Sequence, residues 1–334
     1  MAVDNIIRRI NTLKALKYLQ TVDSATKNDI AIATEISFPT VGKILTELQE
    51  SGEIISQTFD SSNGGRPAER FAINAQNTMT LGLFLDSNSF EYMICDSLKN
   101  VLEDKSIILT DSDNLLEKLI SLIIRLLKKY PAIKILSLGV PGSVNNEKLE
   151  FMPERYKNFN GLDIKKLLEE RLHIPVLVEN DINAIASGQY TRNFPEFKGN
   201  AAHLYIAEDG LGIGITVNGK ILHGDHGVAG EIGFMPYNDS MNIRQALDKA
   251  MLDNDANRLS RVIAKIIALT TCLINPSYFS MSGIGVNEEL LPLIAKYVSE
   301  VIPNMPLPTI IAVDNIRELY FYYLIDVANN FLYS

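Results

Sequence analysis

The sequence predicts an α/β protein in which a small N-terminal winged helix-turn-helix precedes a larger part with a mixed β-sheet. Helical periodicity dominates up to residue 48, and two short strands around a glycine turn follow it. From residue 79 onward, short apolar runs alternate with amphipathic helices, the order typical of an α/β domain. A glycine-rich run at residues 209–219 then leads into a second glycine-rich segment at residues 226–234. These features set the organisation expected for the chain.

Length and composition are those of an ordinary globular protein with room for two or three domains. The 334 residues include 46% hydrophobic and 21% charged side chains, so each domain has material for its own core. No apolar run reaches the roughly 18 residues that a membrane span needs, and the charged start does not resemble a signal peptide. We therefore expect a cytoplasmic protein without a membrane partner. Cys95 and Cys272 lie in separate apolar segments, which predicts two buried, reduced thiols.

The net charge of -9 argues against a protein that is coated with nucleic acid. Residues 1–74 hold eight basic and nine acidic side chains, so the N-terminal part is nearly neutral and the excess acid lies in the remainder. Any contact with DNA must therefore come from a local cluster of basic and polar residues.

Three helices are expected in the N-terminal part. Residues 5–20 carry apolar side chains at three- and four-residue intervals, and a second helix is expected at residues 27–34. The third helix begins at Ser37, a favourable N-cap, with a proline near its first turn where no amide hydrogen bond is lost. Its apolar face is core, and its opposite face presents Ser37, Thr40 and Lys43, which can hydrogen-bond to bases or phosphates.

A strand at residues 53–59, a glycine turn and a second strand at residues 66–73 complete a winged helix-turn-helix. A short helix pair with a hairpin also suits a protein-docking module. The polar start of the third helix and the guanidinium of Arg66 in the wing favour DNA. The predicted DNA-binding residues are therefore Ser37, Thr40 and Lys43 in the major groove and Arg66 in an adjacent groove.

The larger part is expected to contain buried strands and amphipathic helices in alternation. The sequence predicts strands at residues 79–85, 90–95, 101–109, 133–140, 176–179, 201–207, 212–217 and 278–281. It predicts helices at residues 114–130, at residues 258–274 and from residue 317 onward. No exact internal repeat is visible.

Three motifs in this part carry a resemblance to a known family. They are Gly139-Val-Pro-Gly142, Val178-Glu-Asn-Asp-Ile-Asn-Ala184 and the run from Asp209 to Phe234. In this order and spacing, they resemble the ROK family of repressors, open reading frames and sugar kinases. The resemblance covers nearly the whole chain and includes the winged helix of the family's repressor branch. It implies an actin-like, ribonuclease-H-like pair of lobes of the sugar kinase type.

The resemblance also implies the domain boundaries. The winged helix is expected at residues 1–74, the first lobe at residues 75–190 together with 317–334, and the second lobe at residues 191–316. In the sugar kinases of the family, such lobes close on a sugar and on ATP.

Both phosphate-binding loops of the family's kinases are altered in this sequence. The first, Asp-x-Gly-x-Thr, has no glycine in the matching stretch Asp86-Ser-Asn-Ser-Phe90. The second begins Gly-Thr-Gly in kinases, whereas Glu208-Asp-Gly210 stands here. A carboxylate about 4 Å from a phosphate oxygen costs about 4 kcal/mol at an effective dielectric near 20. Unless a magnesium ion bridges the charges, we therefore expect no useful ATP affinity, no catalytic residue in use and no cofactor.

The sugar-binding positions of the family are largely retained. Asp181 matches the kinase general base, Asn180 matches a hydroxyl-binding amide, and Gly142 is expected beside the ligand. Asp181 also suits the N-cap of a helix at residues 182–190, and both roles can hold together. Without a phosphoryl donor, Asp181 is expected to act as a hydrogen-bond acceptor.

The end of the glycine-rich run departs from the family at its zinc site. Glu231 matches the glutamate that binds sugar hydroxyls, but Phe234 stands where the family has a histidine that binds sugar and zinc. The cysteines of the family's zinc motif are missing after Phe234, so no metal is expected. Phe234 either packs where the zinc cluster holds the loop or lies at the pocket mouth as a platform for a sugar face.

Together these features predict a transcriptional regulator of carbohydrate-related genes, most simply a repressor, and not an enzyme. A sugar or sugar phosphate bound by Asn180, Asp181 and Glu231 is expected to change the spacing of two winged helices on a double-stranded DNA operator. A homodimer or higher homo-oligomer is expected because one winged helix covers only a half-site. The alternatives are a ligand-independent regulator with a decayed pocket and a functional sugar kinase.

Overall fold

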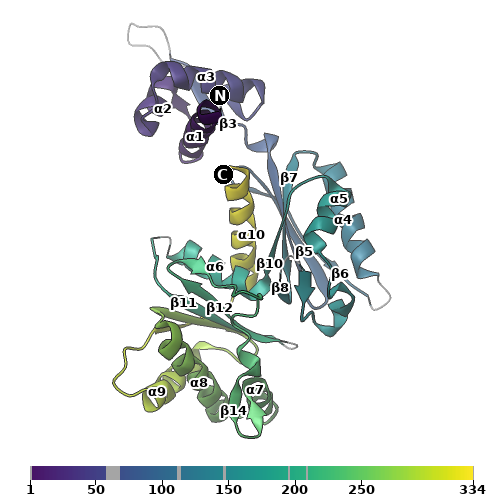
Figure 1. Cartoon of the computed structure of the whole chain (residues 1–334), viewed down its shortest axis with the longest axis vertical. Coiled ribbons are helices and arrows are strands. Elements are labelled where there is room, and N and C mark those ends of the chain that lie inside the picture. The colour runs from purple at the N-terminus through teal and green to yellow at the C-terminus, as the bar shows by residue number, and fades with distance from the viewer. Residues whose placement is uncertain are drawn as a thin grey trace.

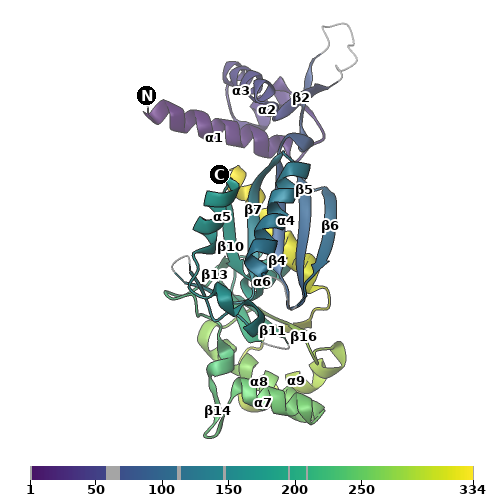
Figure 2. The same ribbon diagram turned by 90° about the vertical axis from the view of Figure 1, so that its right-hand side faces the viewer.

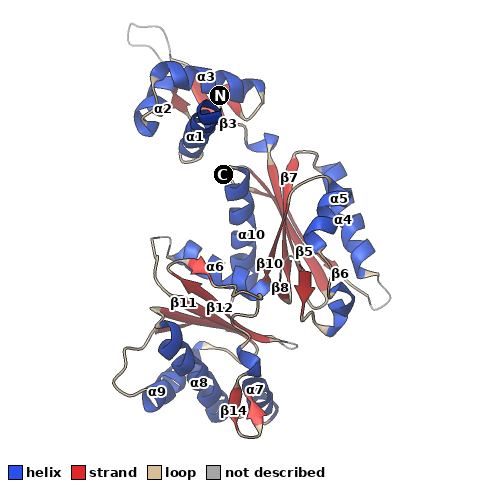
Figure 3. Cartoon of the chain, viewed as in Figure 1, coloured by secondary structure: helices blue, strands red, loops and turns tan. Residues whose placement is uncertain are grey.

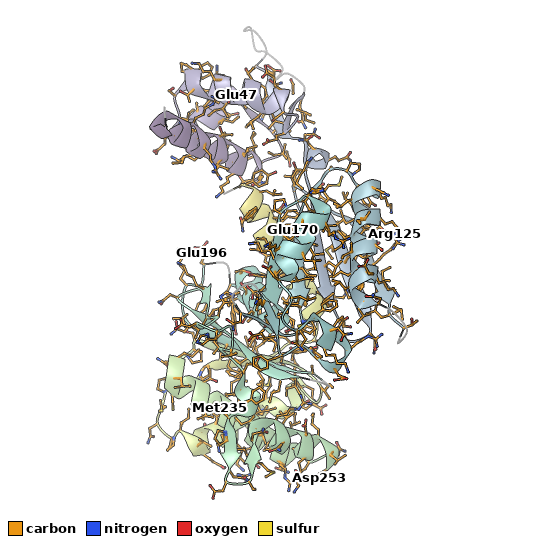
Figure 4. All side chains as sticks on the ribbon, turned by 45° about the vertical axis from the view of Figure 1, so that its right-hand side comes forward. Glu47, Arg125, Glu170, Glu196, Met235 and Asp253 are labelled. Carbon is orange, nitrogen blue, oxygen red and sulfur yellow. The ribbon has the colours of Figure 1, made fainter. Side chains whose placement is uncertain are left out.

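The computed structural model describes residues 2–57, 68–110, 114–145, 148–194, 196–207 and 210–333, with side chains from residue 7 onward. Three parts follow one another along the long axis of the molecule, with the winged helix at one end and the second lobe at the other (Figure 1). In Figure 4, Glu47 marks the winged helix, Arg125 the first lobe and Asp253 the second lobe.

The N-terminal domain is a winged helix-turn-helix, as its sequence predicts. Three helices pack beside an antiparallel sheet of order β1-β3-β2. The elements are α1 Ala2–Leu19, β1 Ala25–Thr26, α2 Lys27–Thr34, α3 Phe38–Glu50, β2 Ile54–Gln57 and β3 Arg70–Ile73. Helix α2 begins with a capping box, in which the Asp29 amide donates to Thr26 Oγ1 at 3.2 Å and the Thr26 amide donates to Asp29 Oδ2 at 2.9 Å. The expected N-cap at Ser37 is wrong in one respect, because its hydroxyl pairs with Thr40 Oγ1 at 2.7 Å and caps no amide.

The first lobe is built on a five-stranded mixed sheet of order β10-β7-β4-β5-β6. Its strands β10, β7 and β4 are parallel, and β4, β5 and β6 are antiparallel. The elements are η1 Ala75–Asn77, β4 Met79–Leu85, β5 Ser89–Asp96, β6 Val101–Ile108, α4 Leu115–Lys129, β7 Ile133–Val140, β8 Ser143–Asn145, β9 Lys148–Glu150, η2 Glu154–Phe159, α5 Ile164–Leu172 and β10 Val176–Asn180. Helices α4 and α5 cover one face of this sheet (Figure 3), where their apolar stripes join the core of the lobe.

The second lobe has a five-stranded mixed sheet of order β13-β12-β11-β16-β17. The elements are β11 Ala201–Ile206, β12 Leu211–Val217, β13 Lys220–Ile221, η3 Ile232–Phe234, β14 Pro236–Asn238, β15 Met241–Asn242, α7 Ile243–Leu252, α8 Ala256–Ile274, β16 Tyr278–Gly283, η4 Glu288–Leu290, α9 Leu291–Val301 and β17 Thr309–Ala312. Helices α7, α8 and α9 cover its outer face (Figure 1). The short helices α5, α7 and α9 were not expected from the sequence.

The two lobes share one topology although the sequence shows no repeat. In each sheet the first three strands in chain order form an antiparallel meander, and the fourth and fifth then add in parallel beside the first. This duplicated arrangement is the two-lobed actin-like fold that the resemblance implies. Burial patterns of short strands carry no information on sheet order, which explains why the duplication is invisible in the sequence.

Helices α6 Asp181–Asn193 and α10 Ile316–Leu332 exchange between the lobes. Helix α6 follows the last strand of the first sheet but packs on β11 and β12 of the second, whereas α10 follows the second sheet and packs on β4 and β7 of the first. The two helices also pack on each other, and their apolar residues form a separate cluster with Phe84 between the lobes. The predicted boundary at residues 190 and 191 falls inside α6, so the division into lobes stays a prediction.

The alternate glycines of the run at residues 209–219 permit a helix to approach β12 closely. A Cβ atom on Gly214 in β12 would lie 2.6 Å from the carbonyl oxygen of Ile182 in α6. In α6 itself, a Cβ on Gly188 would lie 2.1 Å from the carbonyl oxygen of Leu319 in α10. Because glycine has no side chain, β12, α6 and α10 can stack closely at the junction of the lobes.

The two cysteines and the lengths of the helices bear on two further expectations. Both cysteines are free, but only Cys95 is buried, and the expected burial of Cys272 is wrong because it lies on the outward face near the end of α8. Among the helices that the structure describes, none is both long and apolar enough to cross a membrane.

Candidate functional site

A cleft of about 1110 Å³ lies between the lobes and is lined by residues of both. The residues predicted around a ligand all line it; they are Gly142, Asn180, Asp181, Glu231 and Phe234. Parallel pairing of β7 and β10 brings their carboxyl ends together, so that Asn180 Nδ2 donates to the Gly142 carbonyl at 2.9 Å. The structure thus assembles one site from segments that are far apart in the chain, and ligand contact by each residue stays a prediction.

Asn180 has a structural role in this cleft. Its amide donates to the carbonyl of Gly142 and to Asp181 Oδ1, and its carbonyl accepts from the amide of Asn183 at 3.0 Å. Asn180 is therefore the N-cap of α6, and the predicted cap at Asp181 is wrong because the helix begins one residue earlier than expected. Both donors of Asn180 are already used, so in this arrangement it positions Asp181 and the loop at Gly142.

Asp181 and Glu231 place two carboxyl groups in a partly desolvated site. Burial raises the pKa of Asp181 to about 7, and the charge of Glu231 adds to this, while hydrogen bonds from Ile182 and Asn180 oppose it. Burial also raises the pKa of Glu231. Asp181 Oδ1 accepts from the Ile182 amide at 2.7 Å, and no hydrogen bond between described residues uses Oδ2. Ligand hydroxyls that donate to such carboxylates form charge-assisted hydrogen bonds.

Two exposed aromatic side chains line the same cleft. Phe234 is 72% exposed and lines the cleft. Of the two alternatives for this side chain, packing in place of the zinc cluster is therefore wrong. Phe151 also lines the cleft, is 61% exposed and has a positive φ of 54°, a conformation that non-glycine residues rarely adopt. Aromatic faces beside hydrogen-bond acceptors suit a ligand with both apolar and hydroxyl-bearing faces.

Several cleft residues were missed by the sequence reasoning. They are Arg155, Arg244, Arg317 and Tyr320. Arg317 Nε donates to Glu91 Oε2 at 3.1 Å and its Nη1 donates to Asp104 Oδ2 at 3.0 Å, which ties the start of α10 to the edge of the first sheet. No motif or spacing in the sequence distinguishes these residues from other arginines and tyrosines, because tertiary structure brings them to the cleft from three separate elements, namely η2, α7 and α10.

The stretch that matches the first phosphate-binding loop of the family's kinases connects β4 to β5. The stretch from Asp86 to Ser89 forms a tight turn in which the Asp86 amide donates to the Ser89 carbonyl at 2.9 Å. The Ser89 hydroxyl donates to Glu91 at 2.7 Å, so this polar group is also satisfied within the protein. Glu208 and Asp209 stand where kinases of the family have the start of their second phosphate-binding loop, and both lie outside the described residues.

Glu179 joins the two lobes beside the cleft. His223 of the second lobe lies 3.0 Å from Glu179 Oε2 at the end of β10, and the Tyr323 hydroxyl of α10 donates to the same oxygen at 3.2 Å. The hydrogen bond to Glu179 raises the pKa of His223. Within the described residues, no group of three or more histidine, cysteine, aspartate and glutamate side chains is arranged to hold a metal.

The predicted DNA-binding face lies on α3. Ser37 and Lys43 are exposed and Thr40 is half-buried, while Val41, Ile44, Leu45 and Leu48 face the core. Arg66 lies outside the described residues. Phe38 was not expected on this face; it is 51% exposed, and Lys27 Nζ lies 4.1 Å from the centre of its ring.

The sequence matches one family model and is similar to proteins named as repressors. A family model described as the ROK family matches residues 80–250, just over half of the chain. A protein named xylose repressor from Caldicellulosiruptor bescii is 24% identical over 277 residues, which cover 80% of this chain and 69% of that protein.

Two solved structures share the fold. A ROK family transcriptional regulator, described as a homologue of the Escherichia coli MLC protein, aligns with a TM-score of 0.73 and 19% identity over 98% of both chains. A ROK family glucokinase from Streptomyces griseus, in complex with glucose and AMPPNP, aligns with a TM-score of 0.59 and 19% identity over 75% of this chain and 99% of the glucokinase. The alignment with the regulator thus includes the N-terminal domain, and that with the kinase spans about three quarters of the chain.

Proposed function

The chain belongs to the ROK family, and on that premise we propose that it is a DNA-binding transcriptional regulator, most simply a repressor, that senses a small carbohydrate. The observation that carries this proposal is the joining of a winged helix to a two-lobed cleft lined by Asp181, Glu231 and Phe234. The relative named xylose repressor supports a sugar as the effector class. The lack of a glycine between Asp86 and Phe90 argues against phosphoryl transfer, because a phosphate-binding loop needs close approach of its backbone amides to the phosphate oxygens.

The proposed mechanism is a change in lobe angle. A sugar that donates hydroxyls to Asp181 and Glu231 binds both sides of the cleft and favours a closed arrangement. Two winged helices of a homodimer or higher homo-oligomer then change their separation on a roughly palindromic operator.

Selection of bound DNA from a random pool tests the proposed DNA binding. A thermal-shift screen with D-xylose, D-glucose and sucrose tests the proposed carbohydrate sensing. Failure to select any motif contradicts the DNA-binding role.

Replacement of Lys43 by alanine is expected to weaken binding to the selected DNA site about tenfold and to reduce the salt dependence of log Kd by about 0.9 for one lost phosphate contact. Lys43 is exposed on the face of α3 opposite its apolar core residues. Fluorescence anisotropy over a range of salt concentrations measures both quantities. The matched control is Lys128→Ala, an exposed lysine on α4 of the first lobe. Equal losses in the two variants would exclude α3 as the recognition helix.

Replacement of Glu231 by glutamine is expected to weaken sugar binding by about tenfold or more, because hydrogen bonds to a charged acceptor contribute about 1.5 to 3 kcal/mol. Affinity for the operator without sugar is expected to stay unchanged. Calorimetry with the sugar found in the screen and anisotropy with DNA measure the two properties. Glu154→Gln, at a carboxylate with 85% side-chain exposure, is the control. If Glu231→Gln leaves the sugar response intact, the proposed sensing site is wrong.

Two other functions are tested in the same experiments. A ligand-independent regulator would select a DNA motif but show no melting shift with any sugar of a wide panel. A sugar kinase would release ADP from ATP in a coupled assay with one of these sugars. Micromolar binding of Mg-ATP by calorimetry would likewise overturn the proposal that the cleft transfers no phosphoryl group.

A further inference from the structure

Phe38 is the first residue of α3, the helix that is predicted to enter the major groove. Its side chain is 51% exposed, whereas the valine, isoleucine and leucine side chains of α3 are at most 4% exposed. Figures 1 and 2 both show α3 on the side of the winged helix away from the two lobes, with α1 nearer to them. Single exposed apolar side chains are common on protein surfaces. The surroundings of this ring must therefore show whether it has a partner outside the chain.

Lys27, the first residue of α2, holds the exposed ring from one side. Its Nζ lies 4.1 Å from the centre of the Phe38 ring, which is a cation–π contact. Gly42 lies one turn after Phe38 on the same face of α3. A Cβ atom on Gly42 would come within 2.9 Å of Lys27 Cε, so the glycine makes room for the lysine. Because glycine within a helix is less favourable than alanine, this arrangement of ring and ammonium is obtained at a cost in helix stability.

The ammonium of Lys27 is not neutralised by a carboxylate of the described chain. Among the hydrogen bonds and ion pairs between described residues, none uses Lys27 Nζ. An apolar protein surface is a poor match for this corner, because docking there would remove an unpaired charge from water. DNA is a better match, since its phosphates attract the cation while the base edges of the major groove lie close by.

The positions of these two side chains agree with the way in which helix-turn-helix proteins lie on DNA. The N-terminal residues of the recognition helix contact base edges, and the preceding helix crosses the phosphate backbone. Phe38 and Lys27 are the first residues of those two helices. The 5-methyl group of thymine is the apolar group on the base edges of the major groove, and phenylalanine is among the side chains that contact it.

We propose that Phe38 is a specificity-determining residue of the DNA interface and that its ring contacts the 5-methyl group of one thymine in each half-site of the operator. This inference rests on the proposed DNA-binding function and adds to it the base that is read. Lys43 is expected to contribute affinity through phosphate, whereas Phe38 distinguishes thymine from bases that lack the methyl group.

Removal of one methyl group from the DNA tests the inference. Each thymine of the site selected from the random pool is replaced in turn by deoxyuridine, which lacks only the 5-methyl group. Fluorescence anisotropy then measures Kd for the full chain. Replacement at one position of a half-site is expected to weaken binding about fourfold, the factor that corresponds to burial of one methyl group. In the Phe38→Ala variant, binding is expected to be weaker, and the same replacement is expected to have no further effect.

The matched control is Ile10→Ala, which truncates an apolar side chain of similar exposure, 49%, on α1 of the same domain. This variant is expected to keep the fourfold effect of deoxyuridine. If no thymine position responds in the natural protein, or if the response persists in Phe38→Ala, the inference is wrong although DNA binding itself stands. If the natural protein selects no DNA motif, the proposed function fails and the inference fails with it.

Two further measurements test other roles for the ring. Phe38→Ala is expected to fold and to melt close to the natural protein, because half of the ring is already exposed. Failure of this variant to fold would make Phe38 a structural residue and would overturn the inference. Analytical ultracentrifugation of Phe38→Ala is expected to show the oligomeric state of the natural protein. Loss of self-association would mean that a second copy of the chain covers the ring, which also overturns the inference.

Discussion

The Asp181→Asn variant is expected to be more stable than the natural protein, and the difference is expected to depend on pH. Between pH 4 and pH 8, the difference in free energy of unfolding is expected to grow by about 2 to 4 kcal/mol. The pKa of Asp181 is raised from 3.8 to about 7 in the folded protein, mainly by burial. A carboxyl group with a raised pKa stabilises the folded state fully at low pH, and this contribution is lost as the pH rises through about 7. Asparagine has no charge to desolvate, so its contribution does not change with pH.

Urea unfolding of both proteins at several pH values measures this difference. The control is Asp163→Asn, since Asp163 caps α5 by accepting from the Lys166 amide at 2.9 Å and asparagine is an equally good cap. The same Asp181→Asn variant is expected to bind sugar more weakly, because it loses a charged acceptor. A gap between variant and natural protein that is constant from pH 4 to pH 8 would show that Asp181 does not titrate near neutrality. Gain of stability with loss of binding is the pattern expected of a functional site.

Replacement of Gly188 by alanine is expected to destabilise the protein by about 3 kcal/mol, the upper part of the range for overpacking. The added Cβ would lie 2.1 Å from the carbonyl oxygen of Leu319 and 2.9 Å from its carbonyl carbon. Both atoms belong to the backbone of α10, so no side-chain rotation relieves the contact and the two helices must separate. This separation also disturbs the cluster of Phe84, Leu319 and Phe321 between the lobes.

Denaturant unfolding measures the loss, and Ser187→Ala is the control at the neighbouring position of α6. Alanine favours a helix over glycine by about 1 kcal/mol and over serine by about 0.5 kcal/mol, so helix propensity alone predicts that Gly188→Ala stabilises the chain. A stabilised Gly188→Ala protein would therefore contradict the close crossing of α6 and α10. The opposite signs expected from propensity and packing make this variant a sensitive test of the junction between the lobes.

Much of the fold could be predicted because its elements carry periodic patterns. The apolar face of α3, the long amphipathic helices α4 and α8, and the buried strands β7 and β10 all lie close to their predicted positions. Short helices such as α7 and α9 were missed because two or three turns give too few apolar positions for a clear period. The capping box at Thr26 was missed although its Thr-x-x-Asp spacing was visible in the sequence.

The candidate site could be predicted in part because its residues follow strand ends and belong to motifs. Asp181 and Glu231 were found by resemblance, and the structure places both around one cleft. Tyr320 and Arg317 were missed because they reach the cleft from a helix that crosses from the second sheet to the first. The sequence left open whether the Phe234 side chain packs in the lobe or lies exposed at the cleft. The direction of this side chain depends on the backbone of η3, which follows a glycine turn.

The sequence by itself determined the winged helix, the mixed α/β architecture and the family, because these depend on local periodicity and on motifs within short segments. Only the tertiary structure decided that α6 and α10 exchange between the lobes and that Asn180 rather than Asp181 caps α6. It also decided that the Tyr320 hydroxyl is buried without a hydrogen-bond partner among the described residues. The physical reason is the same in each case. Burial, desolvation and close approach depend on atoms from segments distant in the chain, and no single segment encodes their distances.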